Sequence, residues 1–101
     1  MTALEVMPLP DRPGVRASGE ITAVTRSSWE DALAELAERH TDVSFIELSD
    51  VAFIDVSGAT ALAVTVMDLP AGRVVVERPP SHLPRVLEMF WPNLRIEVTP
   101  R

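Results

Sequence analysis

The chain has no cysteine and no lysine, and all nine of its basic residues are arginine. Without cysteine, a disulfide scaffold, a thiol nucleophile and a zinc site with thiolate ligands are excluded. Without lysine, Schiff-base chemistry, a Walker-type phosphate loop and the lysine of a phosphorylation receiver site are excluded. The composition therefore removes several enzyme classes before any motif is considered.

Long apolar runs are missing as well. No stretch approaches the roughly 18 uninterrupted apolar residues of a membrane-spanning helix. Residues 1–10 lack the basic start and apolar run of a secretory signal, so we expect a cytoplasmic protein. Nine basic residues against 15 acidic ones give a net charge of −6. Such a surface repels nucleic-acid phosphates and anionic lipids, so we expect neither direct nucleic-acid binding nor membrane insertion.

The length of 101 residues fits one domain, and 47% of the residues are hydrophobic, which suffices for a core. We expect this single domain to span residues 1–101. Residues 1–14 are rich in proline and are expected to be partly irregular.

Three segments carry apolar residues at the three- and four-residue spacing of a helix. Each begins at a serine that we expect to be the N-cap, the residue whose side chain accepts a hydrogen bond from the first turn. In the first segment, Glu30 stands three residues after the serine and completes a capping box. The segments are residues 27–40, 57–69 and 81–90, which begin at Ser27, Ser57 and Ser81.

Strands are predicted between these helices. Residues 43–48 and 51–54 are almost uninterruptedly apolar, which is typical of a central strand covered on both faces. A bend or bulge is expected at residues 18–20. The first two strands are expected to pair as a hairpin and the later ones to run parallel, because they alternate with helices. The predicted strands are residues 4–9, 15–17, 43–48, 51–54, 73–77 and 94–98, the last at a sheet edge.

The passage from the apolar strand into the second helix contains the candidate site. The strand runs into Asp55, and Ser57 and Gly58 follow at the start of the helix. Sites in open α/β folds form at the carboxyl ends of strands. On the helix, Gly58, Ala61 and Thr65 form a face of small residues on which another protein could dock. A serine in this place is usually only a helix cap, and from the residues alone that interpretation stays open.

Residues 45–58, FIELSDVAFIDVSG, resemble the signature of the STAS family, the anti-sigma factor antagonists. In that signature two apolar runs lead into an Asp-Ser/Thr-Ser/Thr-Gly loop and a helix. Weaker likenesses at residues 18–21, 27–40 and 83–90 extend the resemblance over nearly the whole chain. It implies a single small α/β domain, with a four- to five-stranded mixed sheet and helices packed mainly on one side.

The resemblance also implies a function. In one branch of the family, an anti-sigma kinase of the histidine-kinase-like ATPase type phosphorylates the hydroxyl residue immediately before the glycine. That acceptor falls on Ser57, and the loop aspartate of the family falls on Asp55. The chain would then be no enzyme but a binding module without cofactor or metal. Unmodified, it would sequester the anti-sigma factor and so regulate transcription.

Two residues depart from the family pattern. Val56 replaces the usual hydroxyl residue before the acceptor, and Thr60 stands where a small residue is common. The partner-binding residues implied by the resemblance and by the small helix face are Asp55, Val56, Gly58, Ala61 and Thr65. The alternative within the family is a scaffold that is not phosphorylated, either in a stress-sensing assembly or as an accessory subunit of a membrane transporter.

Other site types fit poorly. A receiver domain needs an acidic pair and a lysine, and the early chain offers only Asp11. A serine hydrolase needs a glycine two residues before the nucleophile, where Asp55 stands. We expect His40 on the apolar stripe of the first helix and His82 in solvent, and their spacing supports no metal site.

Overall fold

The computed structural model describes residues 3–100, which form a five-stranded sheet and three helices. The strands are β1 (Glu5–Pro8), β2 (Gly14–Ile21), β3 (Val43–Ile54), β4 (Arg73–Glu77) and β5 (Glu97–Thr99), and the helices are α1 (Arg26–Arg39), α2 (Val56–Asp68) and α3 (His82–Phe90).

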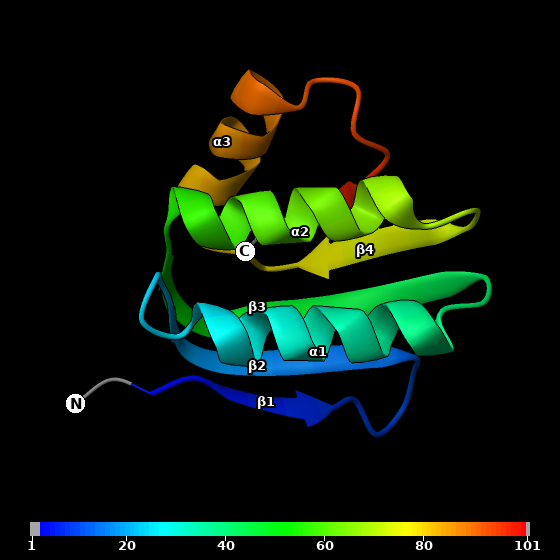
Figure 1. The fold of residues 1–101 in the computed structure, drawn as a ribbon, viewed down its shortest axis with the longest axis horizontal. Coiled ribbons are helices and arrows are strands. Elements are labelled where there is room, and N and C mark those ends of the chain that lie inside the picture. The colour runs from blue at the N-terminus through cyan, green and yellow to red at the C-terminus, as the bar shows by residue number, and fades with distance from the viewer. Residues whose placement is uncertain (1–2, 101) are drawn as a thin grey trace.

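The sheet is mixed, as the sequence predicts. Its strand order is β1-β2-β3-β4-β5, with β1 antiparallel to β2 and every other neighbouring pair parallel. β3 therefore lies at the centre and β5 at an edge. Because β2 and β3 are parallel, their carboxyl ends meet at the same end of the sheet, next to the starts of α1 and α2 (Figure 1).

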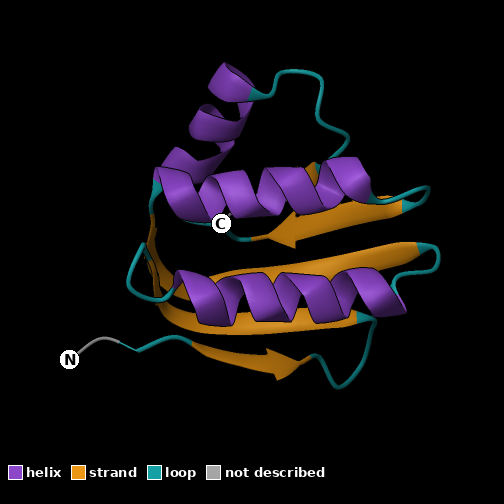
Figure 2. Cartoon of the chain, viewed as in Figure 1, coloured by secondary structure: helices purple, strands orange, loops and turns teal. Residues whose placement is uncertain are grey.

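Helices α1 and α2 lie side by side over one face of the sheet, and α3 packs beside α2 (Figures 1 and 2). This confirms the expected one-sided arrangement. The side chains buried between the helices and the sheet form one continuous core. Its largest fully buried members are Trp29, Ile21, Leu33, Ile46, Leu48, Ile54, Leu62, Leu83, Val51, Val74 and Val76.

The two apolar runs expected at 43–48 and 51–54 form one continuous strand, β3. Its register against β2 shifts twice, and in both places the extra residue belongs to β3. Arg16 and Ser18 pair with Glu47 and Asp50, three positions apart. The irregularity expected in residues 18–20 is therefore found in the partner strand, where the second shift lies opposite Gly19 and Glu20, and the pairing continues beyond it to Ile21 and Ile54.

The second face of β3 has no helix over it, so the prediction of coverage on both faces is wrong. Ion-paired side chains cover part of this face instead. The Glu47 carboxylate is 3% exposed and bonds to the Arg78 guanidinium. Arg12 bonds to Glu77 and lies over the Phe45 ring, with 5.4 Å between guanidinium carbon and ring centroid.

The helix starts differ from the predicted caps. The N-cap of α1 is Thr25 and not Ser27, and it makes no side-chain cap bond. Its hydroxyl is already used, because it donates to the Glu20 carbonyl and accepts from the Thr22 amide. Ser81 does stand at the N-cap of α3, but it has helical backbone angles and makes no side-chain cap bond either.

The terminal strands also differ in length from the prediction. β1 is ordered over Glu5–Pro8, so residues 3–14 are less irregular than expected. β5 covers only Glu97–Thr99, because the Ile96 amide donates locally to the Leu94 carbonyl and not to β4. The predicted domain also includes residues 1, 2 and 101, which lie outside the described residues.

Candidate functional site

Asp55 joins the end of β3 to the start of α2 and is the N-cap of that helix. Its Oδ1 accepts a hydrogen bond from the Gly58 amide at 2.9 Å. The sequence interpretation gave this role to Ser57, which instead lies inside the first turn. The reason is local: an aspartate three residues before a free amide is as good a cap as a serine.

The Ser57 hydroxyl is bonded to the cap itself. It donates to Oδ1 of Asp55 at 2.7 Å. Ser57 is half-buried and lines the open groove described below. The bond fixes the orientation of the hydroxyl and leaves its oxygen lone pairs facing away from the carboxylate.

Asp55 also ties this turn to the loop before α1. Its Oδ2 accepts from the Ala23 amide at 3.1 Å, and its own amide donates to the Ile21 carbonyl at 2.9 Å. The carboxylate thus receives bonds from two parts of the chain, about thirty residues apart in sequence. The sequence placed Asp55 in the site but gave no sign of its second partner, Ala23.

These bonds change the acidity of Asp55. Burial on its own raises the pKa of the carboxyl, because it disfavours the charged form. The hydrogen bonds from Ser57, Gly58 and Ala23 act in the opposite direction and together outweigh burial, so the pKa lies below its ordinary value. Asp55 is therefore a firmly ionised hydrogen-bond acceptor and a weak base.

Gly58 does not belong to an exposed face, which corrects the sequence interpretation. It is buried, and a Cβ placed on it would lie 2.6 Å from Ile21 and 2.8 Å from Ile54. Its carbonyl accepts from Nε1 of Trp29 at 3.0 Å. Gly58 thus allows α2 to approach the strands and α1 closely, and it contributes to the site only through its amide.

Ala61 and Thr65 are half-buried and do lie on the open side of α2. The Thr65 hydroxyl donates to the Ala61 carbonyl at 2.8 Å, so it offers little polarity outward. Both residues line a groove of about 650 Å³ between α1 and α2. The groove has Ser57 at the start of α2 and small side chains along its floor. Its α1 wall consists of Arg26, Glu30, Ala34 and Ala37.

Val56 stands beside the groove and is 55% exposed. The family-typical hydroxyl at this position is thus replaced by an outward apolar side chain. Thr60, the second departure, directs its hydroxyl to the Val56 carbonyl at 2.7 Å. Neither departure blocks access to Ser57.

Comparison with known protein families agrees with the strand–Asp–x–Ser–Gly–helix geometry. A family model described as "Mlab, STAS domain" matches residues 8–91. The chain belongs to the STAS domain family. No curated protein matches the chain.

Within residues 3–100 of this STAS domain, no helix is both long and apolar enough to cross a membrane. The same residues contain no cluster of three or more histidine or acidic side chains arranged to hold a metal ion.

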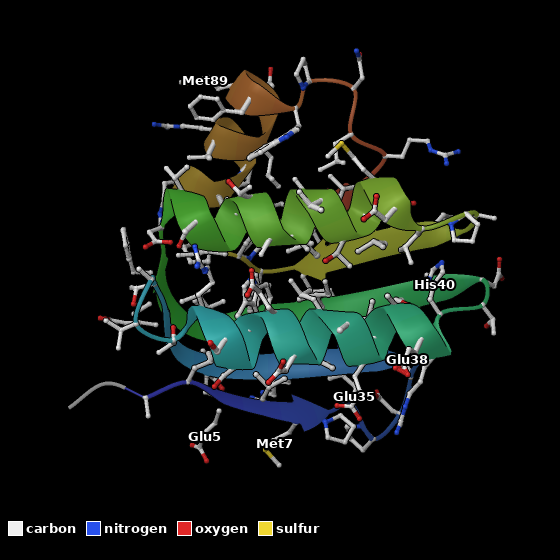
Figure 3. The ribbon with its side chains drawn as sticks, in the orientation of Figure 1. Glu5, Met7, Glu35, Glu38, His40 and Met89 are labelled. Atoms are coloured by element: carbon white, nitrogen blue, oxygen red, sulfur yellow. The ribbon has the colours of Figure 1, made fainter. Side chains whose placement is uncertain are left out.

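The two histidines of the STAS domain have structural partners. His40 ends α1, at the opposite end of that helix from the Asp55 turn, and is bonded to the Ser44 hydroxyl and the Ala71 carbonyl (Figure 3). It is the C-cap and does not belong to the apolar stripe. His82, expected in solvent, stacks on Phe53 with ring centroids 5.1 Å apart, and its Nε2 lies 2.7 Å from the Ile54 carbonyl.

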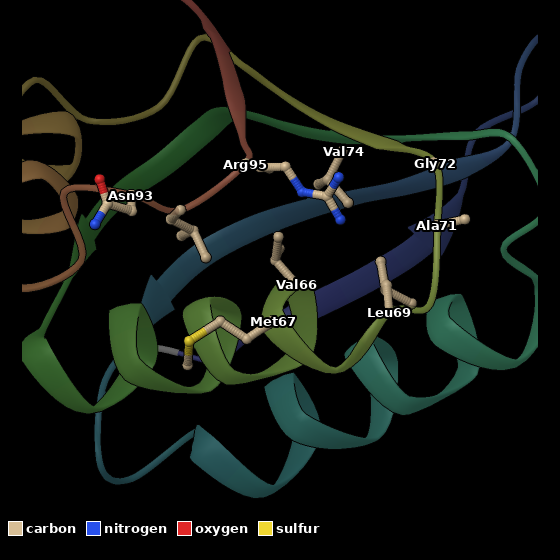
Figure 4. A pocket seen from close by; sticks show the side chains of 9 residues that line it. Val66, Met67, Leu69, Ala71, Gly72, Val74, Asn93 and Arg95 are labelled. Carbon is tan, nitrogen blue, oxygen red and sulfur yellow. The ribbon is translucent and has the colours of Figure 1, made fainter.

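A smaller cavity of about 200 Å³ lies between α2 and the segment that leads into β5 (Figure 4). Its lining is mainly aliphatic, with Asn93 and Arg95 as its polar side chains. It contains no nucleophile and none of the predicted site residues. The candidate site of the STAS domain is therefore the Asp55–Ser57 turn with the adjoining groove.

Proposed function

We propose that this STAS domain is an anti-sigma factor antagonist that works in the cytoplasm. The unmodified chain binds a kinase-type anti-sigma factor through the Ser57 turn and the groove between α1 and α2. Phosphorylation of Ser57 by that partner ends the complex. The observation that supports this most is the placement of one oriented, accessible hydroxyl at a helix start beside a groove of small side chains.

The transfer step uses Ser57 as substrate. Its Oγ forms a bond to the γ-phosphorus of ATP, the bond from that phosphorus to the bridging oxygen breaks, and ADP leaves. The bond to Asp55 orients the hydroxyl for this attack. In this proposal the hydroxyl proton passes to a base of the kinase, and Asp55, which accepts the hydroxyl hydrogen bond, acts as a positioning residue.

The phosphate then acts by charge. It adds about −1.5 to −2 charges at one point. The dipole at the start of α2 favours an anion, while Asp55, which already accepts from the Gly58 amide, opposes it, and we expect the fold to survive. The docked partner does not tolerate it, because burying an unpaired charge costs several kcal/mol. A loss of about 3–4 kcal/mol weakens a complex a few-hundredfold.

For the test, the histidine-kinase-like ATPase encoded nearest the gene, called the neighbouring ATPase below, is purified, and phosphate transfer from ATP is followed by intact-mass and fragment mass spectrometry. One added phosphate on Ser57 is expected. The Ser57→Ala variant should take up none. Ser81→Ala is the matched control and should behave as the parent, since Ser81 is exposed and its side chain makes no cap bond. Phosphate uptake by Ser57→Ala would overturn the assignment of the acceptor.

A second candidate function is supported by Val56. An exposed valine in place of a hydroxyl makes the turn more apolar, which suits a permanent interface. The chain would then be a non-switching scaffold or an accessory subunit, in a stress-sensing assembly or of a membrane transporter. This candidate is favoured if ATP and the neighbouring ATPase leave the mass unchanged while the complex forms equally well with Ser57→Ala.

A further inference from the structure

We propose that the loop of residues 22–25 is a second partner-recognition element, and that Asp55 couples its position to the state of Ser57. The partner is the anti-sigma kinase, which in this view also inserts Val24 into an apolar pocket. The identity of the partner depends on the proposed function. The coupling through Asp55 is a property of the isolated chain.

The loop is held in one shape by its own hydrogen bonds. The Thr25 hydroxyl accepts from the Thr22 amide at 2.9 Å, and the Thr25 amide donates to the Thr22 carbonyl at 3.1 Å. The Val24 amide donates to the Thr22 hydroxyl at 3.3 Å. The remaining amide, that of Ala23, donates to Oδ2 of Asp55. The Asp55 carboxylate is thus the side chain that joins this ordered loop to the Ser57 turn, next to the bond from the Asp55 amide to the Ile21 carbonyl.

Val24 is the most exposed of the large apolar side chains in residues 3–100, at 90%. An ordered loop that holds an apolar side chain in water is an arrangement suited to a binding contact, since little entropy is lost when a partner covers it. Val24 follows Ala23, and Val56 follows Asp55, so the Ala23–Asp55 bond places the two exposed valines on neighbouring turns. In this proposal, a partner that contacts Ser57 also contacts Val24 and Val56.

Phosphorylation acts on this bond through Asp55. A phosphorylated serine has lost the hydroxyl proton that it donates to Oδ1, and it presents a negative charge to the same carboxylate. Repulsion moves the carboxylate away, and the Ala23 amide loses its acceptor. The partner then meets Val24 on a loop that is no longer tied to the Asp55 carboxylate, in addition to meeting the new charge.

The coupling is tested on the free chain by amide exchange and ¹H–¹⁵N spectra. Ser57→Asp should shift the Ala23 amide and speed its exchange severalfold. Asp55→Ser shows the shift and exchange rate of the Ala23 amide when its acceptor is missing, because serine still caps Gly58 but has no second oxygen for Ala23. Thr65→Asp, which adds the same charge two turns along α2, should leave the Ala23 amide unchanged. An Ala23 amide that is the same in Ser57→Asp and in the parent overturns the coupling.

The recognition role is tested by phosphate transfer from the neighbouring ATPase. Val24→Ala should lower the efficiency of transfer about tenfold, mainly through a higher KM. Met7→Ala is the matched control, because Met7 is 60% exposed on the edge strand β1 (Figure 3). Equal KM values for Val24→Ala and Met7→Ala overturn the recognition role, whereas loss of all transfer to the parent overturns the proposed function and leaves the coupling intact.

Discussion

At the residue scale, the function of the site depends on how one carboxylate is shared. Oδ1 of Asp55 receives the Ser57 hydroxyl and the Gly58 amide, and Oδ2 receives the Ala23 amide. The carboxylate therefore caps a helix, orients the Ser57 hydroxyl and contacts the loop before α1. A change at this residue should affect stability and phosphate transfer together.

Asp55→Asn keeps one oxygen to cap Gly58 but removes the charge and the acceptor of the Ala23 amide, so it should lower the free energy of unfolding by about 1 kcal/mol at pH 7. The pKa of Asp55 is lowered in the folded state, so the charge stabilises the fold above the unfolded pKa of about 3.9. This stabilisation is lost as the pH falls through the folded pKa. The difference between parent and variant should therefore shrink below about pH 4 in urea denaturation. If the difference in the free energy of unfolding between parent and variant stays constant with pH, the charge of Asp55 does not stabilise the fold.

At the element scale, the start of α2 is positioned by the absence of a side chain at Gly58. Gly58→Ala should destabilise the chain by about 1–3 kcal/mol, because the new methyl group would overlap Ile21 and Ile54. In an uncrowded helix the same change stabilises by about 1 kcal/mol. Thermal unfolding distinguishes the two, and a raised midpoint would show that the contact is not tight.

The sequence predicted the elements better than their ends. The apolar spacing gave all three helices, and the resemblance gave the Asp55–Gly58 turn. The cap of α2 was misplaced by two residues because serine and aspartate compete for the same role, and sequence does not show which oxygen meets the Gly58 amide. Likewise, Ser27 is not the cap of α1, since the N-cap is Thr25, two residues earlier, and the helix begins at Arg26.

Long-range partners were beyond prediction for a different reason. Ala23 meets Asp55, and His82 meets the Ile54 carbonyl, only because β2, β3 and α3 come together in the fold. Neither Ala23 nor His82 stands in a pattern that indicates such a contact. Similarly, Glu47 looked like a polar break in an apolar run, and only the sheet places Arg12 and Arg78 near it.

At the scale of the whole molecule, an ion-pair cluster on the helix-free face ties distant segments together. Glu47 of β3 bonds to Arg78 after β4, and Arg12 before β2 bonds to Glu77. Glu47→Ala should lower the free energy of unfolding by about 2 kcal/mol. This is less than the loss for a fully buried pair, because Arg78 remains half-exposed.

Asp50→Ala is the matched control for that prediction. Asp50 lies on β3, the same strand as Glu47, and pairs with Arg16 of β2. Both side chains of this pair are 51% exposed. Exposed pairs contribute about 0–1 kcal/mol, so the control should unfold close to the parent in guanidinium chloride. If Glu47→Ala and Asp50→Ala lower the free energy of unfolding equally, burial of Glu47 contributes nothing to stability.

The helix-free face and the helical face of the sheet thus differ in what they carry. The ion pairs join segments of the helix-free face, and the groove between α1 and α2 with the Ser57 turn lies on the other face. Under the proposed function, a single negative charge at Ser57 ends the complex with the anti-sigma factor without unfolding the domain.

The most direct measurement is the affinity of Ser57→Asp and Ser57→Asn for the purified neighbouring ATPase, by isothermal titration. The two side chains have nearly the same size and differ in charge. Ser57→Asn should bind within a few-fold of the parent, and Ser57→Asp at least about a hundredfold more weakly. Equal affinities for the two variants, with both folded, would contradict the account.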